Sequence, residues 1–232
     1  MIRALALVLY FSFVPFLDGF PLPPALETAH LLGKGRPSGA PPVPLSDELY
    51  ALGWSRTSAF AVLERRVIDD NTRVVRLRVY DVVEDKVLWE KQWPDWGEDA
   101  DQAAWWTPKE AEVEQIFSRF GLEPTQLQLG VFPLIADEEF YTLAVRPTRD
   151  PTDPTWISRL EIAVNSTGRG LKTIRNGGGF WRWATLLGFI PSPFESRLAL
   201  VLLVQPAGWQ GVKEPLRFLI TGLSLKAGFL KP

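Results

Sequence analysis

Residues 73–93, RVVRLRVYDVVEDKVLWEKQW, decide the fold class of this chain. The first half alternates, which separates Val75, Leu77 and Val79 from Arg76, Arg78 and Tyr80. Alternation with a period of two is typical of a β-strand. Residues 84–86 form a turn signal, and the next strand is expected to carry Val87, Trp89, Lys91 and Trp93 on one side. The stretch therefore predicts a β-meander with one solvated face.

Strand patterns continue on both sides of this meander. Residues 59–67 are a short apolar run that opens into charge and ends at the turn signal 69–71. Further strands are predicted at residues 127–134, 139–145, 156–164, 171–174, 197–205 and 216–225. The run at 197–205 is almost continuously apolar, which favours a central strand buried on both faces.

One amphipathic helix is predicted between these strands, at residues 107–120. Thr107 is a suitable capping residue, Pro108 suits the first helical position, and Gly121 can close the helix in a left-handed conformation. Apolar residues follow at helical spacing: Val113, Ile116, Phe117 and Phe120. This apolar face is expected to cover a sheet.

The composition is that of a folded protein and excludes several classes of function. Apolar residues make up 46% of the 232 residues and charged residues 22%, with a net charge of −2. Basic residues are scattered among acidic ones, so the sequence predicts no nucleic-acid partner. The chain has no cysteine and a single histidine, His30, which excludes thiol chemistry and argues against a serine triad or a zinc site.

The N-terminus predicts export. Arg3 precedes an apolar run at residues 4–17 that is too short to span a bilayer but fits a signal peptide. Residues 1–19 are interpreted as a signal peptide or an uncleaved anchor, and residues 20–44 as a Pro-rich linker or strap. Residues 45–232 then form a single β-rich domain, which we expect to be periplasmic or secreted.

A short phrase occurs twice in the chain. Residues 52–54, Leu-Gly-Trp, lead to a strand at 60–63, and residues 187–189, Leu-Gly-Phe, lead to a strand at 198–201. Each unit spans about 40 residues, which is the size of a propeller blade. If the units are equivalent, Trp54 and Phe189 should both be buried, beside strands paired on two sides.

The phrase resembles blade openings in TolB-like β-propellers, where an aromatic turn precedes a strand with Leu-Ala or Phe-Ala. Residues 79–82 and 86–89 look like the closing hairpin of such a blade. The chain has room for about four blades at most, and the helix interrupts them. The fold class that follows is mainly β with one amphipathic helix, built from antiparallel meanders that are propeller-like or sandwich-like and form no closed propeller.

A looser resemblance covers most of the domain. It rests on residues 53–55, 86–89, 192–199 and 222–229, together with the mid-chain helix. These segments are similar to an uncharacterised family of exported bacterial proteins that has no assigned activity. The resemblance therefore implies a location and no mechanism.

The chain has ten tryptophans, and several of them flank an acidic stretch at residues 95–101. Exposed rings beside carboxylates would suit sugar binding, because an aromatic face stacks on the apolar face of a sugar. The candidate ligand-binding residues are Trp96, Asp99, Asp101, Trp105 and Trp106. The alternative is that these rings fill the core between sheet and helix, and a calcium site or a glycosidase pair is less favoured still.

The sequence thus predicts an exported, non-catalytic, β-rich binding or scaffold domain whose ligand is open. The alternative is a carbohydrate-binding or carbohydrate-active protein that uses residues 93–106. No catalytic residue, metal or cofactor is predicted, although an enzyme stays open. The expected partner is an envelope protein or a glycan, with membrane contact only through an uncleaved N-terminal segment.

Overall fold

A computed structural model describes residues 20–26, 48–68, 72–97, 101–125, 127–176, 180–206 and 216–230. The described chain is mainly β, with antiparallel sheets and one helical stretch, and it forms neither a closed barrel nor a closed propeller. The predicted fold class is therefore confirmed.

The first sheet is a four-stranded meander extended by one short strand. Its strands are β1 (Glu48–Ser55), β2 (Ala59–Val67), β3 (Arg73–Asp81), β4 (Lys86–Pro94) and β5 (Leu122–Pro124). They lie in the order β4-β3-β2-β1-β5, so the chain returns after the helix to pair with the first strand.

The second sheet contains two meanders joined at one point. One consists of β6 (Leu134–Ala136), β7 (Glu139–Arg149), β8 (Ile157–Ser166) and β9 (Gly170–Asn176). The other consists of β10 (Trp181–Pro191), β11 (Arg197–Pro206) and β12 (Arg217–Ser224). The only pairing between β8 and β10 joins Ile157 to Trp181, which lets the two meanders fold face to face.

The helical stretch begins earlier than predicted. It runs through α2 (Gln102–Trp106), a 3-10 turn η1 (Thr107–Lys109) and α3 (Glu110–Phe120). Asp101, and not Thr107, caps it, because the Asp101 carboxylate accepts the Ala103 N–H at 2.9 Å. The end is as predicted: Gly121 has a φ of 60°. On the apolar face, Val113, Ile116 and Phe117 are buried, whereas Phe120 is only partly buried.

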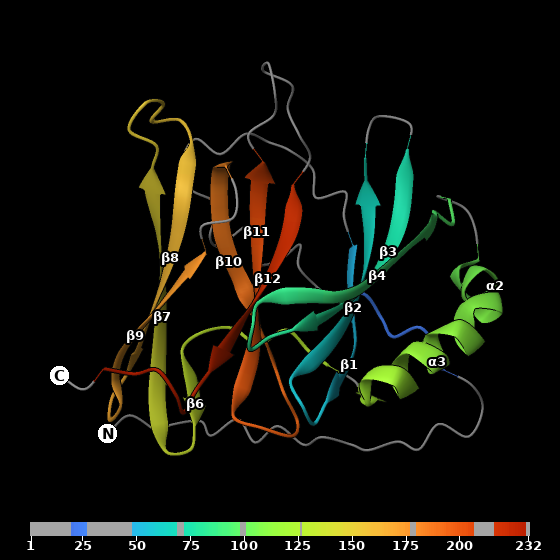
Figure 1. Cartoon of the computed structure of the whole chain (residues 1–232), viewed down its shortest axis with the longest axis horizontal. Coiled ribbons are helices and arrows are strands. Elements are labelled where there is room, and N and C mark those ends of the chain that lie inside the picture. Colours follow the sequence, from blue (N-terminus) through green and yellow to red (C-terminus); the bar gives the residue numbers. More distant parts are fainter. Residues whose placement is uncertain are drawn as a thin grey trace, which may run out of the picture.

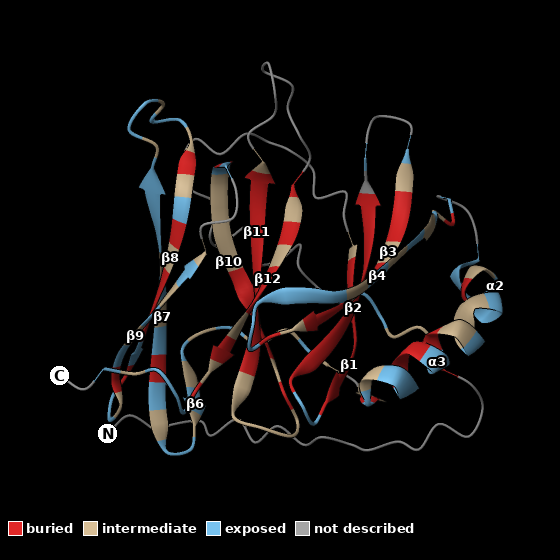
Figure 2. Ribbon diagram, in the orientation of Figure 1, coloured by how far each residue is buried: buried red, intermediate tan, exposed pale blue. Residues whose placement is uncertain are grey.

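The elements stack in layers along the long axis of the molecule (Figure 1). The helical stretch covers one face of β1–β4, and the opposite face of β1–β4 packs on β10–β12. The other face of β10–β12 packs on β7 and β8. Figure 2 shows the consequence, since β2 and β11 are almost entirely buried, whereas β7 and β9 are largely exposed.

This stacking overturns the predicted solvated face of the first meander. Tyr80 is 9% exposed and belongs to the core that β1–β4 share with β10–β12. Arg78, on the same face, donates to Glu90 and to the Tyr80 hydroxyl. Alternation identifies two different faces but does not tell whether a polar face meets water or other polar groups.

The two Leu-Gly-aromatic phrases form the same local structure. In β1 the pairing with β2 skips Leu52, and in β10 the pairing with β11 skips Leu187, so each leucine is the extra residue of a β-bulge. Trp54 and Phe189 are both buried, as predicted. Strands β2 and β11 are each paired on two sides, also as predicted.

A neighbouring backbone segment closely approaches the glycine of each phrase. A methyl group on Gly53 would overlap the carbonyl oxygen of Glu123 in β5, and one on Gly188 would overlap that of Gly130. Gly130 exchanges two backbone hydrogen bonds with Phe189, at 2.8 and 2.9 Å. The segment after the helix therefore bridges both bulges, and glycine is required for its close approach.

The equivalence of the two units is not complete. Trp54 pairs with Phe60, but Phe189 pairs with Leu200 and not with Leu198, because β10 and β11 extend further before their turn. Trp54 points into the core between the sheets, whereas Phe189 points away from the first sheet. Both rings therefore point the same way along the stack: Trp54 points from the first sheet toward β10–β12, and Phe189 points from β10–β12 toward β7 and β8.

Several strand predictions need correction. Residues 127–134 form only a bridge at Gly130 and the start of β6, and the sequence pattern does not predict β1, β5 or β10. Val87 does not share a side with Trp89, because a bulge at Leu88 pairs Val87 with Tyr80 and Trp89 with Val79. A bulge reverses which residues of a strand face each side of the sheet, and the local sequence pattern does not predict where a bulge occurs.

The segment at residues 20–26 lies against the folded domain. Phe20 is buried at 4.6 Å from the Phe117 ring, measured between centroids, and its carbonyl accepts the Trp106 indole N–H at 2.6 Å. At the other end of this segment, the Leu26 N–H donates to the Leu49 carbonyl at 2.8 Å. These residues at the start of the predicted linker act as a strap across the first sheet.

Candidate functional site

The predicted ligand residues of the Trp-rich stretch come from two elements. Trp96 follows β4, whereas Trp105 and Trp106 lie on α2. Trp96 and Trp106 are buried and Trp105 is partly buried. Asp101 is exposed and caps the helix, and Asp99 lies outside the described residues.

The rings of this stretch pack mainly on one another. The Trp105 ring lies 5.1 Å from Trp96 and 6.2 Å from Trp93, both edge to face. Its indole N–H donates to the Pro94 carbonyl at 3.1 Å, and the Lys109 ammonium lies 3.7 Å from its ring centre. Only Trp105 keeps a partly open ring among the predicted binding tryptophans.

Arg65 fixes the loop that follows β4. Its guanidinium donates twice to the Asp95 carboxylate, at 2.7 and 3.0 Å, and once to the Gly97 carbonyl. It also lies over the Trp96 ring at 4.8 Å. Burial alone would raise the pKa of Asp95, but the hydrogen bonds and charge of Arg65 outweigh it and hold the pKa below its usual value.

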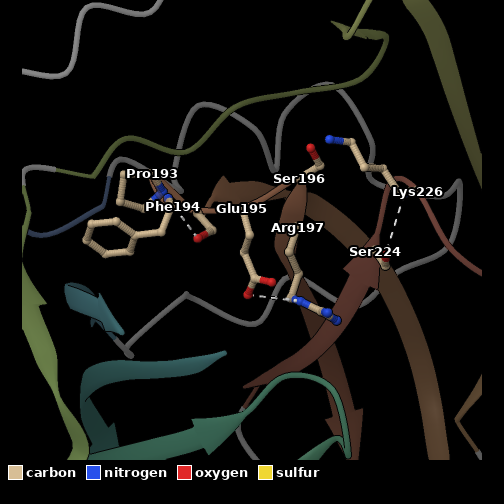
Figure 3. Close-up of a pocket in the computed structure, with 8 residues that line it drawn as sticks. Pro193, Phe194, Glu195, Ser196, Arg197, Ser224 and Lys226 are labelled. Atoms are coloured by element: carbon tan, nitrogen blue, oxygen red, sulfur yellow. Dashed lines mark hydrogen bonds and ion pairs between the residues drawn. The ribbon is translucent and has the colours of Figure 1, made fainter. Parts of the chain in front are cut away.

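A recess of about 580 Å³ opens at the turn between β10 and β11. Its wall is formed by Ser192, Pro193, Phe194, Glu195, Ser196 and Arg197, with Ser224 and Lys226 from the end of β12. Figure 3 shows these side chains arranged along the turn, with Lys226 reaching toward Ser196. Turns from several meanders meet at this end, so polar side chains converge there, while Phe194 packs against the core between the first sheet and β10–β12.

The charges of the recess are held in neighbouring pairs. Arg197 donates to Glu195 at 3.1 Å, and Lys226 lies 3.6 Å from the carboxylate of Asp137. The Ser196 hydroxyl also donates to Asp137, at 3.1 Å. The recess thus offers hydroxyl groups and nearly neutral ion pairs together with the apolar Phe194, which suits recognition of a polar ligand.

Two contacts tie this end to the first sheet. Arg56, in the turn between β1 and β2, lies over the Phe194 ring at 4.8 Å and pairs with Glu123 at 2.9 Å. The Asp85 carboxylate accepts the Thr221 hydroxyl and the Gly222 N–H, at 2.9 and 2.6 Å, and its burial raises its pKa. The recess is therefore built on a rigid support.

The described residues contain no group of three His, Cys, Asp or Glu side chains that could hold a metal ion. Within the same residues, no helix has the length and hydropathy needed to cross a membrane.

The sequence did not single out the recess. Residues 192–199 support the family resemblance, but no ligand role follows from a Ser-Pro-Phe-Glu-Ser pattern alone. The partners Asp137 and Lys226 come from turns far away in sequence, and only the stacking of the meanders brings them to Ser196.

Comparison with known proteins gives no match: no family model, no curated protein and no solved structure is similar to this chain.

Proposed function

We propose that the protein is an exported, non-catalytic binding or scaffold domain, whose ligand occupies the recess between Ser192 and Lys226. The observation that carries this proposal is the recess itself, whose lining residues Ser196 and Phe194 contact Asp137 and Arg56 from turns of other meanders. Binding residues are often placed on turns supported by a rigid sheet framework. The N-terminal pattern around Arg3 supports the exported location.

The chemistry of the recess supports binding more than catalysis. Glu195 is bonded to Arg197, and Asp137 accepts from Ser196 and lies beside Lys226. Each carboxylate is thereby held next to a cation and is engaged inside the protein. Serine hydroxyls and paired charges instead provide fixed hydrogen-bonding positions for a ligand.

A second candidate function is carbohydrate binding at the Trp-rich stretch. It is favoured by Trp105, whose ring is partly open beside the exposed Asp101. The buried Trp96 and Trp106 would then support the ring and would not touch the sugar.

Thermal melting with a panel of peptides, glycans and small envelope metabolites separates these functions, because a ligand of the native state raises the melting temperature. A recess ligand should stabilise the wild type but not the double variant Glu195→Gln/Lys226→Ala. A glycan ligand at the Trp-rich stretch should lose its effect in Trp105→Ala. Lys86→Ala is the matched control, because Lys86 is exposed on β4, outside both sites. A ligand that raises the melting temperature as much in the double variant and in Trp105→Ala as in Lys86→Ala would refute both assignments.

A further inference from the structure

The end of the molecule opposite the recess carries an aromatic pair, of which Phe180 is exposed and Trp156 is partly buried. Phe180, just before β10, is 55% exposed, and its ring meets Trp156 edge to face at 5.7 Å. Trp156 closes the turn between β7 and β8, which projects from one corner of the fold (Figure 1). An exposed aromatic ring beside a projecting turn is typical of contact surfaces.

Exposed arginines lie on the four strands of this part of the fold. They are Arg146 and Arg149 of β7, Arg159 of β8, Arg175 of β9 and Arg182 of β10. The carboxylates in the same region are Asp150, Asp153 and Glu161. Five guanidiniums against three carboxylates leave this end positive, although the whole chain has a net charge of −2.

The three carboxylates are engaged inside the protein. Asp150 accepts the Thr152 N–H and Asp153 accepts the Thr155 N–H, at 2.7 and 2.9 Å. Glu161 lies between two of the arginines, 3.9 Å from Arg146 and 3.7 Å from Arg175.

Two guanidiniums remain open to an outside partner. Arg159 is exposed, lies opposite Thr148 in the sheet, and has no ion pair or hydrogen bond among the described residues. Arg182 is exposed on β10 and interacts only over a distance with Asp153.

We propose that this end, defined as Trp156, Phe180 and the flanking Arg159 and Arg182, docks on an anionic phospholipid bilayer. Guanidiniums pair with lipid phosphates, and aromatic rings settle at the level of the headgroups. The inference rests on the proposed exported location, which puts the domain beside a bilayer and away from nucleic acid. It goes beyond the N-terminal segment, which is the only membrane contact that the sequence predicts.

Flotation of the full chain with phosphatidylcholine vesicles, with and without phosphatidylglycerol, tests the proposal. Any affinity of the N-terminal apolar run should be similar for both vesicles, so the added binding to phosphatidylglycerol measures the charged end. The double variant Arg159→Glu/Arg182→Glu should reduce this added binding at least about tenfold. Raising the salt concentration should reduce the added binding of the wild type in the same way, because salt screens charge interactions. Phe180→Ser should weaken it less, and Arg119→Glu on α3 is the matched control.

Equal flotation with both vesicles, or an undiminished effect of phosphatidylglycerol in the double variant, would overturn the proposal. So would binding of a single-stranded oligonucleotide that depends on the same arginines while vesicles do not bind. Circular dichroism and melting of each variant show whether it is folded. A cytoplasmic location in cells would defeat the proposed function, whereas it would leave the vesicle measurement as it stands.

Discussion

At the scale of single residues, two glycines connect the repeated phrases to the fold. Gly53 and Gly188 each follow the extra leucine of a bulge, and each lies close to a carbonyl oxygen of the segment paired beside it. No larger residue fits, because the obstacle is backbone and cannot rotate away. The aromatic residue that follows each glycine is buried.

Gly53→Ala should therefore destabilise the protein by about 2–3 kcal/mol through overpacking against β5. Denaturant unfolding measures the change. Gly97→Ala is the control: a methyl group there meets no atom within 4 Å, and its φ of 85° costs about 1 kcal/mol. An equal loss in the free energy of unfolding for the two variants would mean that β5 does not closely approach β1 at Gly53.

The Asp95–Arg65 pair predicts a dependence of stability on pH. Because the pKa of Asp95 is lowered in the folded state, its stabilisation is present above the unfolded value near 4 and is lost as the pH falls through the folded pKa. Asp95→Asn should cost about 2–3 kcal/mol at neutral pH, and the cost should shrink below about pH 4.

Urea unfolding at a series of pH values measures this difference. Asp101→Asn is the control, because asparagine also caps a helix and leaves the Arg65 contacts intact. A loss for Asp95→Asn that stays constant down to the most acidic folded condition would show that the ion pair is not its cause.

At the scale of elements, the helical stretch closes the outer face of the first sheet. Val113, Ile116 and Phe117 face the strands, and Phe20 of the strap adds an edge-to-face contact with Phe117. Lys91 of β4 pairs with Glu112 on the exposed side of the same contact. The strap, the helix and the sheet thus share one apolar core.

Phe117→Ala should destabilise the protein by about 3–5 kcal/mol, since the ring is 4% exposed and leaves a cavity. Thermal or urea unfolding gives the value, with Gln115→Ala on the exposed face of α3 as the control. A change below about 1 kcal/mol would show that the helix does not pack on the sheet.

The sequence predicts the elements whose pattern is local and misses those set by distant contacts. Alternation at 73–81 and the left-handed Gly121 follow from short-range chemistry, and both are observed. The helix start was misplaced because Thr107-Pro108 fits a first turn equally well, yet that turn continues α2. The recess depends on Asp137 meeting Ser196, which no local pattern encodes.

At the scale of the whole molecule, three meanders stack with successive faces in contact, and the helix covers one end of the stack. The strand order does not follow the chain, because the last meander, β10–β12, lies in the middle (Figure 1). The turns therefore lie at two ends of the molecule. The recess is at one end, and the surface formed by Trp156, Phe180, Arg159 and Arg182 is at the other. We propose that the binding functions lie at these ends.

Export is a prediction about the whole chain. Expressed in a bacterial host with its own N-terminus, the protein should fractionate outside the cytoplasm, because residues 1–17 have the pattern of a signal. A variant that lacks residues 1–19 is the control and should stay inside the cell. Recovery of the full-length protein from the soluble cytoplasm would contradict the prediction.

The central claim is that the protein binds a ligand at the turn between β10 and β11 and does not transform it. Calorimetric titration with the best ligand from the melting panel, followed by mass spectrometry of the ligand, measures both parts of this claim. We predict one bound ligand per chain, recovered unchanged, and binding weakened by at least about tenfold in Glu195→Gln/Lys226→Ala. Unchanged affinity in that variant, or a chemically altered ligand, would contradict the account.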